Sequence, residues 1–194
     1  MLTLAADRLP GLAPEPSEQL MARVADGDAR AFEDLVARLH GPGLGLATRI
    51  LHDRGDAEDA LQAALTRLWT DAHRFDPARG APEAWFRRIL VNLCLDRRRT
   101  IRPAAPLEAA HGLAAAAPDP FEASVAAART RRVDAAMARL NPRQRAAIAL
   151  FHGEGASMAE IAEVLATTPK AVEGLLARAR KELADMLITD RAEL

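Results

Sequence analysis

The most constraining feature of the sequence is a stretch of eighteen residues that cannot contribute to a folded core. Residues 103–120 read PAAPLEAAHGLAAAAPDP, with four prolines, eight alanines and almost no large apolar side chains. This composition predicts a flexible linker. It divides the chain into an N-terminal tail over 1–16, a block over 17–102, the linker, and a second block over 121–194. Both blocks are near the lower size limit for independent folding.

Both blocks are predicted to be helical. Apolar residues recur at spacings of three and four, and strand-like alternation nowhere extends beyond a few residues. The expected fold class is therefore all-α, with two small helical domains joined by the linker. The chain has 26 Lys and Arg residues against 27 Asp and Glu residues. A nucleic-acid role must therefore come from local clusters of charge.

The composition also limits the classes of protein and the cellular compartments that the sequence fits. A single cysteine excludes a disulfide scaffold and a cysteine-built zinc site. The sequence contains no apolar run of the roughly 18–20 residues that a membrane span needs, and its first residues do not have the pattern of a signal peptide. We expect a cytoplasmic protein that is not inserted in a membrane.

Capping and turn residues set the expected helix limits in the first block. A helix that follows Asp28 is expected to end at Gly-Pro-Gly, residues 41–43. Asp53 or Asp56 is expected to cap the next helix. Pro82 is placed where the first turn of a third helix tolerates proline.

In the second block, the same kind of punctuation predicts a helix-turn-helix. Asn141 precedes a proline and is expected to cap a helix, and Ser157-x-x-Glu160 is a capping box. Thr168 followed by Pro169 repeats the cap-and-proline pattern a few residues later. A short capped helix, a short turn and a longer helix are the parts of a helix-turn-helix.

The longer helix of this pair is predicted to carry a DNA-facing surface. If Val172 lies at the centre of its buried face, the rotation of 100° per residue selects the outward residues. Small residues there let the backbone approach a groove, and cations reach phosphates or base edges. The alternative is an ordinary helical hairpin with a solvated charged face. The outward residues are Lys170, Glu173, Gly174, Ala177 and Lys181, with Arg178 at the flank.

A second candidate surface is a basic helix near the end of the first block. Residues 85–102 hold six arginines against one acid, Asp96, a local charge of +5. Basic residues beside aromatics such as Phe75 and Trp85 suit single-stranded nucleic acid. In the alternative, the aromatics belong to the core and the arginines form a solvated helix end. The arginines are Arg87, Arg88, Arg97, Arg98, Arg99 and Arg102.

The acidic cluster over 53–59, with a local charge of −3, is better explained by helix capping than by a partner surface. The five histidines are scattered, and the glycine-rich stretch over 41–45 lacks the Gly-Lys-Ser/Thr of a phosphate loop. Cys94 lies between two leucines and is expected to be a small buried hydrophobe. We therefore expect no enzymatic activity, no metal and no cofactor.

Four segments of the chain resemble bacterial sigma factors of the sigma-70 family, in its extracytoplasmic-function (ECF) branch. They read DGDARAFEDLVARL, DAEDALQAALTRLW, FDPARGAPEAWFRRILVNLCLDRRR and LNPRQRAAIALFHGEGASMAEIAEVLATTPKAVEGLLARARKEL. The resemblance covers about residues 25–102 and 130–185, and two independent patterns occur in the order found in the family. It implies a sigma region 2 bundle, followed by a sigma region 4 helix-turn-helix.

The resemblance also implies partners and sites. The partners are promoter DNA, core RNA polymerase through its β′ clamp coiled coil and β flap, and an anti-sigma factor. The −10 element would be read by Phe75, Asp76, Arg79, Trp85, Arg87, Arg88 and Asn92, with the phosphate-binding candidates Arg97, Arg98 and Arg99 on the same helix. The −35 element would be read by Thr168, Pro169, Lys170, Glu173, Gly174, Ala177, Arg178 and Lys181. Asp56, Asp59, Leu61 and Gln62 would lie at the β′ interface.

The chain departs from the family pattern at two places. Ala63 follows Gln62 where the family often has Glu, and the recognition helix reads Val-Glu-Gly where Val-Lys-Ser is common, so that Glu173 replaces a cation. Two other classes of protein fit the sequence less well. A stand-alone helix-turn-helix regulator has no need of the +5 arginine helix, and an all-helical anti-sigma or adaptor protein does not need two basic surfaces.

Overall fold

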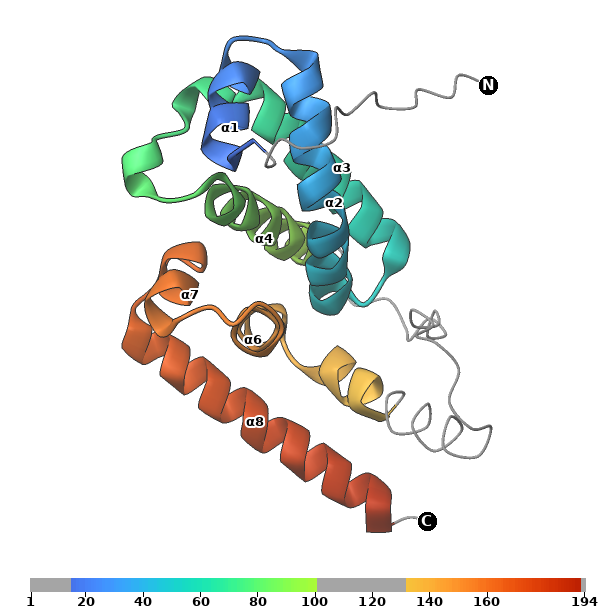
Figure 1. The fold of residues 1–194 in the computed structure, drawn as a ribbon. Coiled ribbons are helices and arrows are strands. Elements are labelled where there is room, and N and C mark those ends of the chain that lie inside the picture. The colour runs from blue at the N-terminus through green and yellow to red at the C-terminus, as the bar shows by residue number, and fades with distance from the viewer. Residues whose placement is uncertain (1–14, 101–131, 193–194) are drawn as a thin grey trace.

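The computed structural model describes residues 15–100 and 132–192, with only the backbone described at 98–100 and 189–192 (Figure 1). The described residues form helices and no strands, which confirms the predicted all-α class. The predicted linker over 103–120 and nearly all of the predicted tail lie outside the described residues. None of the described helices is long and apolar enough to span a membrane.

The first block is a bundle of four helices with a two-turn loop before the last. The helices α2, α3 and α4 pack against one another, and α1 packs on α2 and α4. The elements are α1 (Ser17–Ala25), α2 (Ala29–Leu51), α3 (Arg54–Thr70), the 3₁₀ turns η1 (Ala72–Arg74) and η2 (Pro77–Arg79), and α4 (Pro82–Thr100).

The second block contains the predicted helix-turn-helix. A helix over 132–139 leads into α6 (Pro142–Ile148) and a π-helical turn, η3 (Ala149–Gly153). The helix-turn-helix itself consists of α7 (Met158–Val164) and the long α8 (Pro169–Ala192), which pack on each other.

The predicted caps are present at the starts of these helices. Asp53, rather than Asp56, caps α3. Asn141 and Ser157 form capping boxes at α6 and α7, and the Thr168 hydroxyl accepts a hydrogen bond from the third backbone N–H after it. Because each cap satisfies N–H groups that the helix leaves without partners, the sequence fixes these starts locally.

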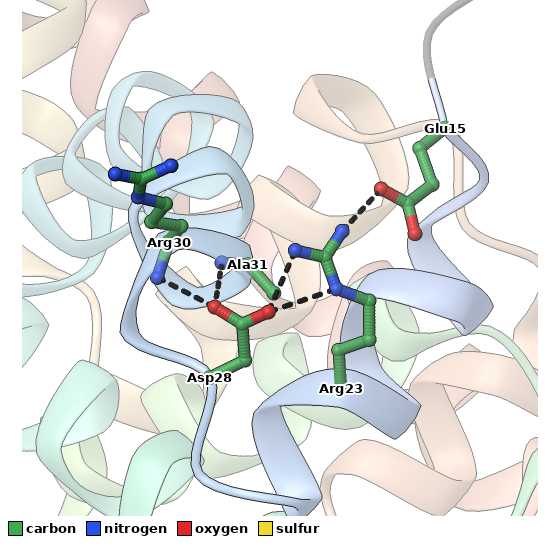
Figure 2. A network of polar contacts seen from close by, with 5 residues as sticks. All are labelled: Glu15, Arg23, Asp28, Arg30 and Ala31. Carbon is green, nitrogen blue, oxygen red and sulfur yellow. Dashed lines mark hydrogen bonds and ion pairs between the residues drawn. The ribbon is translucent and has the colours of Figure 1, made fainter.

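The entry into α2 is held by a small polar network (Figure 2). The Asp28 carboxylate accepts hydrogen bonds from the backbone N–H groups of Arg30 and Ala31, at 2.9 and 3.2 Å. Its other oxygen accepts from the Arg23 guanidinium at 2.6 Å, and Arg23 also contacts Glu15 at 2.7 Å. The Arg23 hydrogen bond is the main cause that lowers the pKa of Asp28. The network therefore ties the end of α1 to the start of α2.

The prediction that residues 41–43 end a helix is wrong, because α2 continues through Pro42 to Leu51. The glycine at position 43 has a packing role instead. A Cβ built on Gly43 would lie 2.9 Å from Leu61 Cδ1 and 3.1 Å from the Phe86 ring. The missing side chain therefore lets α3 and α4 approach the backbone of α2. The helix ends at His52, which adopts a left-handed conformation with φ of 53°.

Helix α6 packs against both blocks. Its buried residues include Ala146 and Ala147, and Leu150 in the following turn is also fully buried. It packs on α8 within its own block and on α2 and α4 of the first block. In Figure 1 it lies between α4 and α8. Because Gln144 and Arg145 of this short helix are buried as well as its apolar residues, α6 is covered on most sides, and the first block supplies part of that cover.

We predict opposite effects for two glycine substitutions on α2. Gly43→Val places methyl groups against Leu61 and Phe86, and should lower the free energy of unfolding by about 1–3 kcal/mol. Gly41→Ala, where nothing lies within 4 Å of a built Cβ, should raise it by roughly 0.5–1 kcal/mol through helix propensity. Urea denaturation followed by circular dichroism measures both. Equal tolerance of the two changes would contradict the packing role of Gly43.

Candidate nucleic-acid interface

The loop before α4 is shaped by its own residues. The Asp76 carboxylate accepts a hydrogen bond from the Ala78 N–H at 3.0 Å and so fixes the turn η2. Gly80 then has φ of 126°, a conformation that L side chains rarely adopt. The Phe75 ring packs against Trp85 of α4, with centroids 5.8 Å apart. The loop is therefore held against the first turns of α4.

This loop and α4 line a hollow of about 560 Å³. Phe75 and Trp85 are half-buried in the bundle and also line the hollow. Their predicted role at DNA stays a prediction. Asp76 and Arg79 are exposed, while Arg87 and Arg88 are half-buried. The residues that the first block contributes are Arg74, Phe75, Asp76, Ala78, Arg79, Gly80, Ala81, Ala84, Trp85, Arg87 and Arg88.

Farther along α4, Asn92 is exposed and Arg97 is engaged by two carboxylates of α3. The Arg97 guanidinium contacts Asp56 Oδ1 at 2.7 Å and Asp59 Oδ2 at 2.7 Å. The hydrogen bond that Arg97 donates to the Asp56 carboxylate is the main cause that raises the pKa of Arg97. Part of the +5 charge inferred from the sequence is thus neutralised within the bundle.

These ion pairs connect residues of two predicted sites. Arg97 is predicted to contact promoter DNA, whereas Asp56 and Asp59 are predicted to contact core polymerase. All three roles remain predictions. The side chains of Arg98 and Arg99 are outside the described part of the structure, as is all of Arg102.

The other predicted polymerase-contacting residues lie on a different side of α3. Leu61 is 3% exposed, and Gln62 is exposed beside it. Both line a groove of about 560 Å³ between α2 and α3, to which Phe32 and Trp69 contribute two rings that meet edge to face, with centroids 5.0 Å apart. Trp69 is 36% exposed. The remaining lining residues are Ala29, Val36, His40, Glu58, Leu65 and Thr66.

The recognition helix of the helix-turn-helix has the predicted orientation. Val172, Leu176 and Ala179 are buried against α6 and α7. The turn before α8 is fixed by Arg143 of α6, whose guanidinium donates to the Leu165 carbonyl at 2.6 Å. Gly174 is half-buried. The exposed residues of the predicted −35 surface are Thr168, Pro169, Lys170, Glu173, Ala177, Arg178 and Lys181.

Sequence reasoning missed several residues that the structure places at these surfaces. Arg74 lines the loop hollow, and its position in the loop and its charge could have indicated it. Phe32 lines the α2–α3 groove together with Leu65 and Trp69. The helical spacing of Leu61, Leu65 and Trp69 was visible in the sequence, but their pairing with α2 is a tertiary contact.

Cys94 is fully buried on α4, as expected of a small hydrophobe. Burial raises the pKa of its thiol to about 12. We predict that the native protein reacts very slowly with a thiol reagent at pH 8, because the reactive thiolate is scarce and the sulfur is shielded. In urea, where both effects are lost, one thiol per chain should react at the rate of a free cysteine. Rapid labelling of Cys94 in the native protein would show that the core around α4 opens easily.

Comparison with known families identifies the two blocks. Residues 35–103 match Sigma-70 region 2, and residues 130–183 match Sigma-70, region 4. Together the matches span more than half of the chain and fall on the bundle and on the helix-turn-helix. The chain belongs to the sigma-70 family of RNA polymerase sigma factors.

Individual relatives place the chain in the ECF branch. RNA polymerase sigma factor CnrH of Cupriavidus metallidurans is 35% identical over 188 residues, which cover 91% of this chain and 97% of CnrH. The ECF RNA polymerase sigma factor SigM of Mycobacterium tuberculosis is 37% identical over 88% of this chain and 84% of SigM. The solved structure of CnrH in complex with the cytosolic domain of CnrY superposes with a TM-score of 0.66 at 30% identity, covering 91% of this chain and 99% of that chain.

Proposed function

We propose that this ECF sigma factor directs core RNA polymerase to its promoters through two separate DNA-reading surfaces. The observation that carries the proposal is their joint presence on one chain. A basic, aromatic hollow lies at the loop before α4, and an exposed recognition face lies on α8. The chain itself performs no covalent chemistry in this scheme and needs no cofactor.

The loop hollow suits an unstacked base of the −10 element. Phe75 and Trp85 offer aromatic surface, and Arg79, Arg87 and Arg88 lie around them to contact the backbone of the strand. Stacking of a base on an aromatic ring stabilises a single strand by about 1–3 kcal/mol per base. Capture of one extruded base would therefore bias the promoter toward opening.

The recognition face suits the major groove of the −35 element. Ala177 and Gly174 are small, and Lys170, Arg178 and Lys181 are exposed. In this proposal the three cations would reach phosphates or base edges. Glu173 lies on the same face, where its carboxylate can accept a hydrogen bond from cytosine but repels phosphates. We expect Glu173 to shift the −35 sequence preference.

The apolar groove between α2 and α3 suits the β′ coiled coil of core polymerase. Gln62 and Thr66 border a floor that is built from Leu61, Leu65 and the Phe32–Trp69 ring pair. An amphipathic helix commonly docks in such a groove through apolar anchors. Asp56 and Asp59, which pair with Arg97, would act at the edge of this surface. The β flap is the expected partner of the second block. An anti-sigma factor is a further expected partner; the similar CnrH was solved in complex with the cytosolic domain of CnrY.

Run-off transcription tests the function. Core polymerase with this protein should initiate on a subset of promoters from a genomic library, and core polymerase alone should not. Lys170→Ala with Arg178→Ala should reduce initiation mainly on promoters that depend on their −35 element, because each lost contact weakens duplex binding. Promoter-specific binding by the free chain with no effect of polymerase would support a stand-alone regulator instead.

Binding of core polymerase in the α2–α3 groove can be tested by mutation. Gln62→Ala with Trp69→Ala should weaken binding to core polymerase at least tenfold, because exposed aromatic anchors carry much of the energy of an interface. Arg67→Ala is the matched control, since Arg67 is exposed on α3 but does not line the groove. Fluorescence anisotropy of labelled protein with core polymerase measures both. If the groove variant binds core polymerase with unchanged affinity, the groove is not the polymerase-docking site.

A further inference from the structure

Arg180 is a cation of the recognition helix that the sequence pattern does not assign to DNA. It is exposed on α8, seven residues after Glu173. Because seven residues make about two helical turns, the two side chains share one side of the helix. Glu173 belongs to the face that the proposed function assigns to the −35 element. Arg180 therefore lies at the edge of that face, toward its C-terminal end.

The Arg180 guanidinium is held by an aromatic ring. Its Cζ atom lies over the Phe151 ring, 5.3 Å from the ring centroid. Phe151 belongs to the π-helical turn η3, is half-buried and packs against the hydrophobic core, so that the ring itself is fixed. A cation is attracted to the face of a ring, and a stacked guanidinium keeps N–H groups at its edge for other partners. The ring thus orients Arg180 and leaves it able to donate hydrogen bonds.

This arrangement leaves the positive charge of Arg180 without a counter-charge. None of the ion pairs within the described parts of the chain involves Arg180. Arg97 is the contrast, because the carboxylates of Asp56 and Asp59 both contact its guanidinium. An aromatic ring orients a cation without neutralising it. Arg180 is therefore preorganised to bind an external anion.

The Phe151–Arg180 pair lies where a helix-turn-helix approaches the phosphate backbone. In this motif the recognition helix enters the major groove, and the helix before it crosses the backbone. The turn η3 precedes that helix, α7, and packs on it. The pair thus connects the recognition helix to the segment that leads into the backbone-crossing helix. In the proposed complex, Arg180 would lie beside a backbone phosphate.

We propose that Phe151 positions Arg180 as an additional contact to a backbone phosphate of the −35 element. Arg180 donates hydrogen bonds to the phosphate oxygens, and Phe151 acts through Arg180 without touching DNA. The inference rests on the proposed function, since it assumes that α8 lies in the major groove of the −35 element. Because every sequence presents the same phosphates, the contact raises affinity for all −35 sequences alike.

The salt dependence of promoter binding tests the phosphate contact. Core polymerase assembled with Arg180→Gln should bind a promoter duplex with a slope of log affinity against log salt that is smaller in magnitude by about 0.9, the value for one lost phosphate contact. Fluorescence anisotropy of a labelled duplex measures the slope. The same reduction is expected on a copy of the promoter with one substituted −35 base pair. Arg132→Gln is the matched control, since it removes the same charge from an exposed position of the helix over 132–139 and should leave the slope unchanged.

A shorter duplex separates contact with DNA from effects on polymerase. On a fragment that ends downstream of the −35 element, the Arg180→Gln assembly and the unaltered assembly should bind equally, because the proposed phosphate is absent. An equal loss of affinity on the full and the shortened duplex would place the effect of Arg180 outside the −35 element and overturn the inference.

A double-mutant cycle tests the role of the ring. Phe151→Leu should weaken binding of the full promoter by roughly two- to fivefold, the range for an exposed cation–π contact. If the ring acts through Arg180, Phe151→Leu should have no effect in the Arg180→Gln background. Phe151→Trp retains a ring face for the cation and should keep the affinity of the unaltered chain. An equal loss from Phe151→Leu in both backgrounds would show that the ring supports the fold and does not position Arg180.

The outcomes distinguish this inference from the proposed function. If the unaltered assembly prefers the promoter to a scrambled duplex but Arg180→Gln keeps the full salt slope, the phosphate contact is wrong and the proposed function stands. If the unaltered assembly shows no preference for the promoter, the proposed function fails and the inference fails with it.

Discussion

The close approach of three helices at Gly43 is the constraint on which the first block depends. Because α2 has no side chain there, Leu61 of α3 and Phe86 of α4 reach its backbone at one level of the bundle. That packing fixes α3 against α2, which forms the apolar groove. It also fixes α4, whose first turns hold Phe75 and the loop hollow. The surface proposed for polymerase and the surface proposed for the −10 element therefore both depend on the packing of α3 and α4 against α2 at Gly43.

Charge is distributed so that the free chain presents little net attraction to DNA. The whole chain has a formal charge of −1. Arg97 is engaged by Asp56 and Asp59 within the bundle, and the arginines of the hollow face Glu160 and Glu163. A protein that reads DNA only as part of a larger assembly needs no strong affinity of its own, because linkage of two weak sites by polymerase raises the effective affinity.

The sequence predicted most of what depends on local chemistry. The caps at Asp53, Asn141 and Ser157 and the inward turn of Val172 follow from hydrogen-bonding groups and helical spacing within a few residues. The burial of Cys94 followed from its apolar neighbours. The sigma-family resemblance further predicted the order of the two blocks, and the family matches over 35–103 and 130–183 confirm that family.

What the sequence could not predict depends on partners that are distant in the chain. Gly-Pro-Gly over 41–43 was misread as a helix end because the contacts that make Gly43 necessary come from α3 and α4. The split of the predicted acidic interface, with Asp56 and Asp59 facing Arg97 and Gln62 facing the groove, required the positions of α2 and α4. The approach of α7 to the hollow joins segments about eighty residues apart, across a linker with no pattern of its own.

The central claim is that promoter recognition belongs to the assembly of this chain with core polymerase, through both of its DNA-reading surfaces. The most direct test is the affinity for a promoter duplex recovered by run-off transcription, measured with and without core polymerase. The free chain should bind promoter and scrambled duplexes alike, in the non-specific range of about 10⁻⁴–10⁻⁶ M. With core polymerase, the promoter should bind at about 10⁻⁸ M or tighter. Nanomolar, sequence-specific binding by the free chain, unchanged by polymerase, would contradict the account.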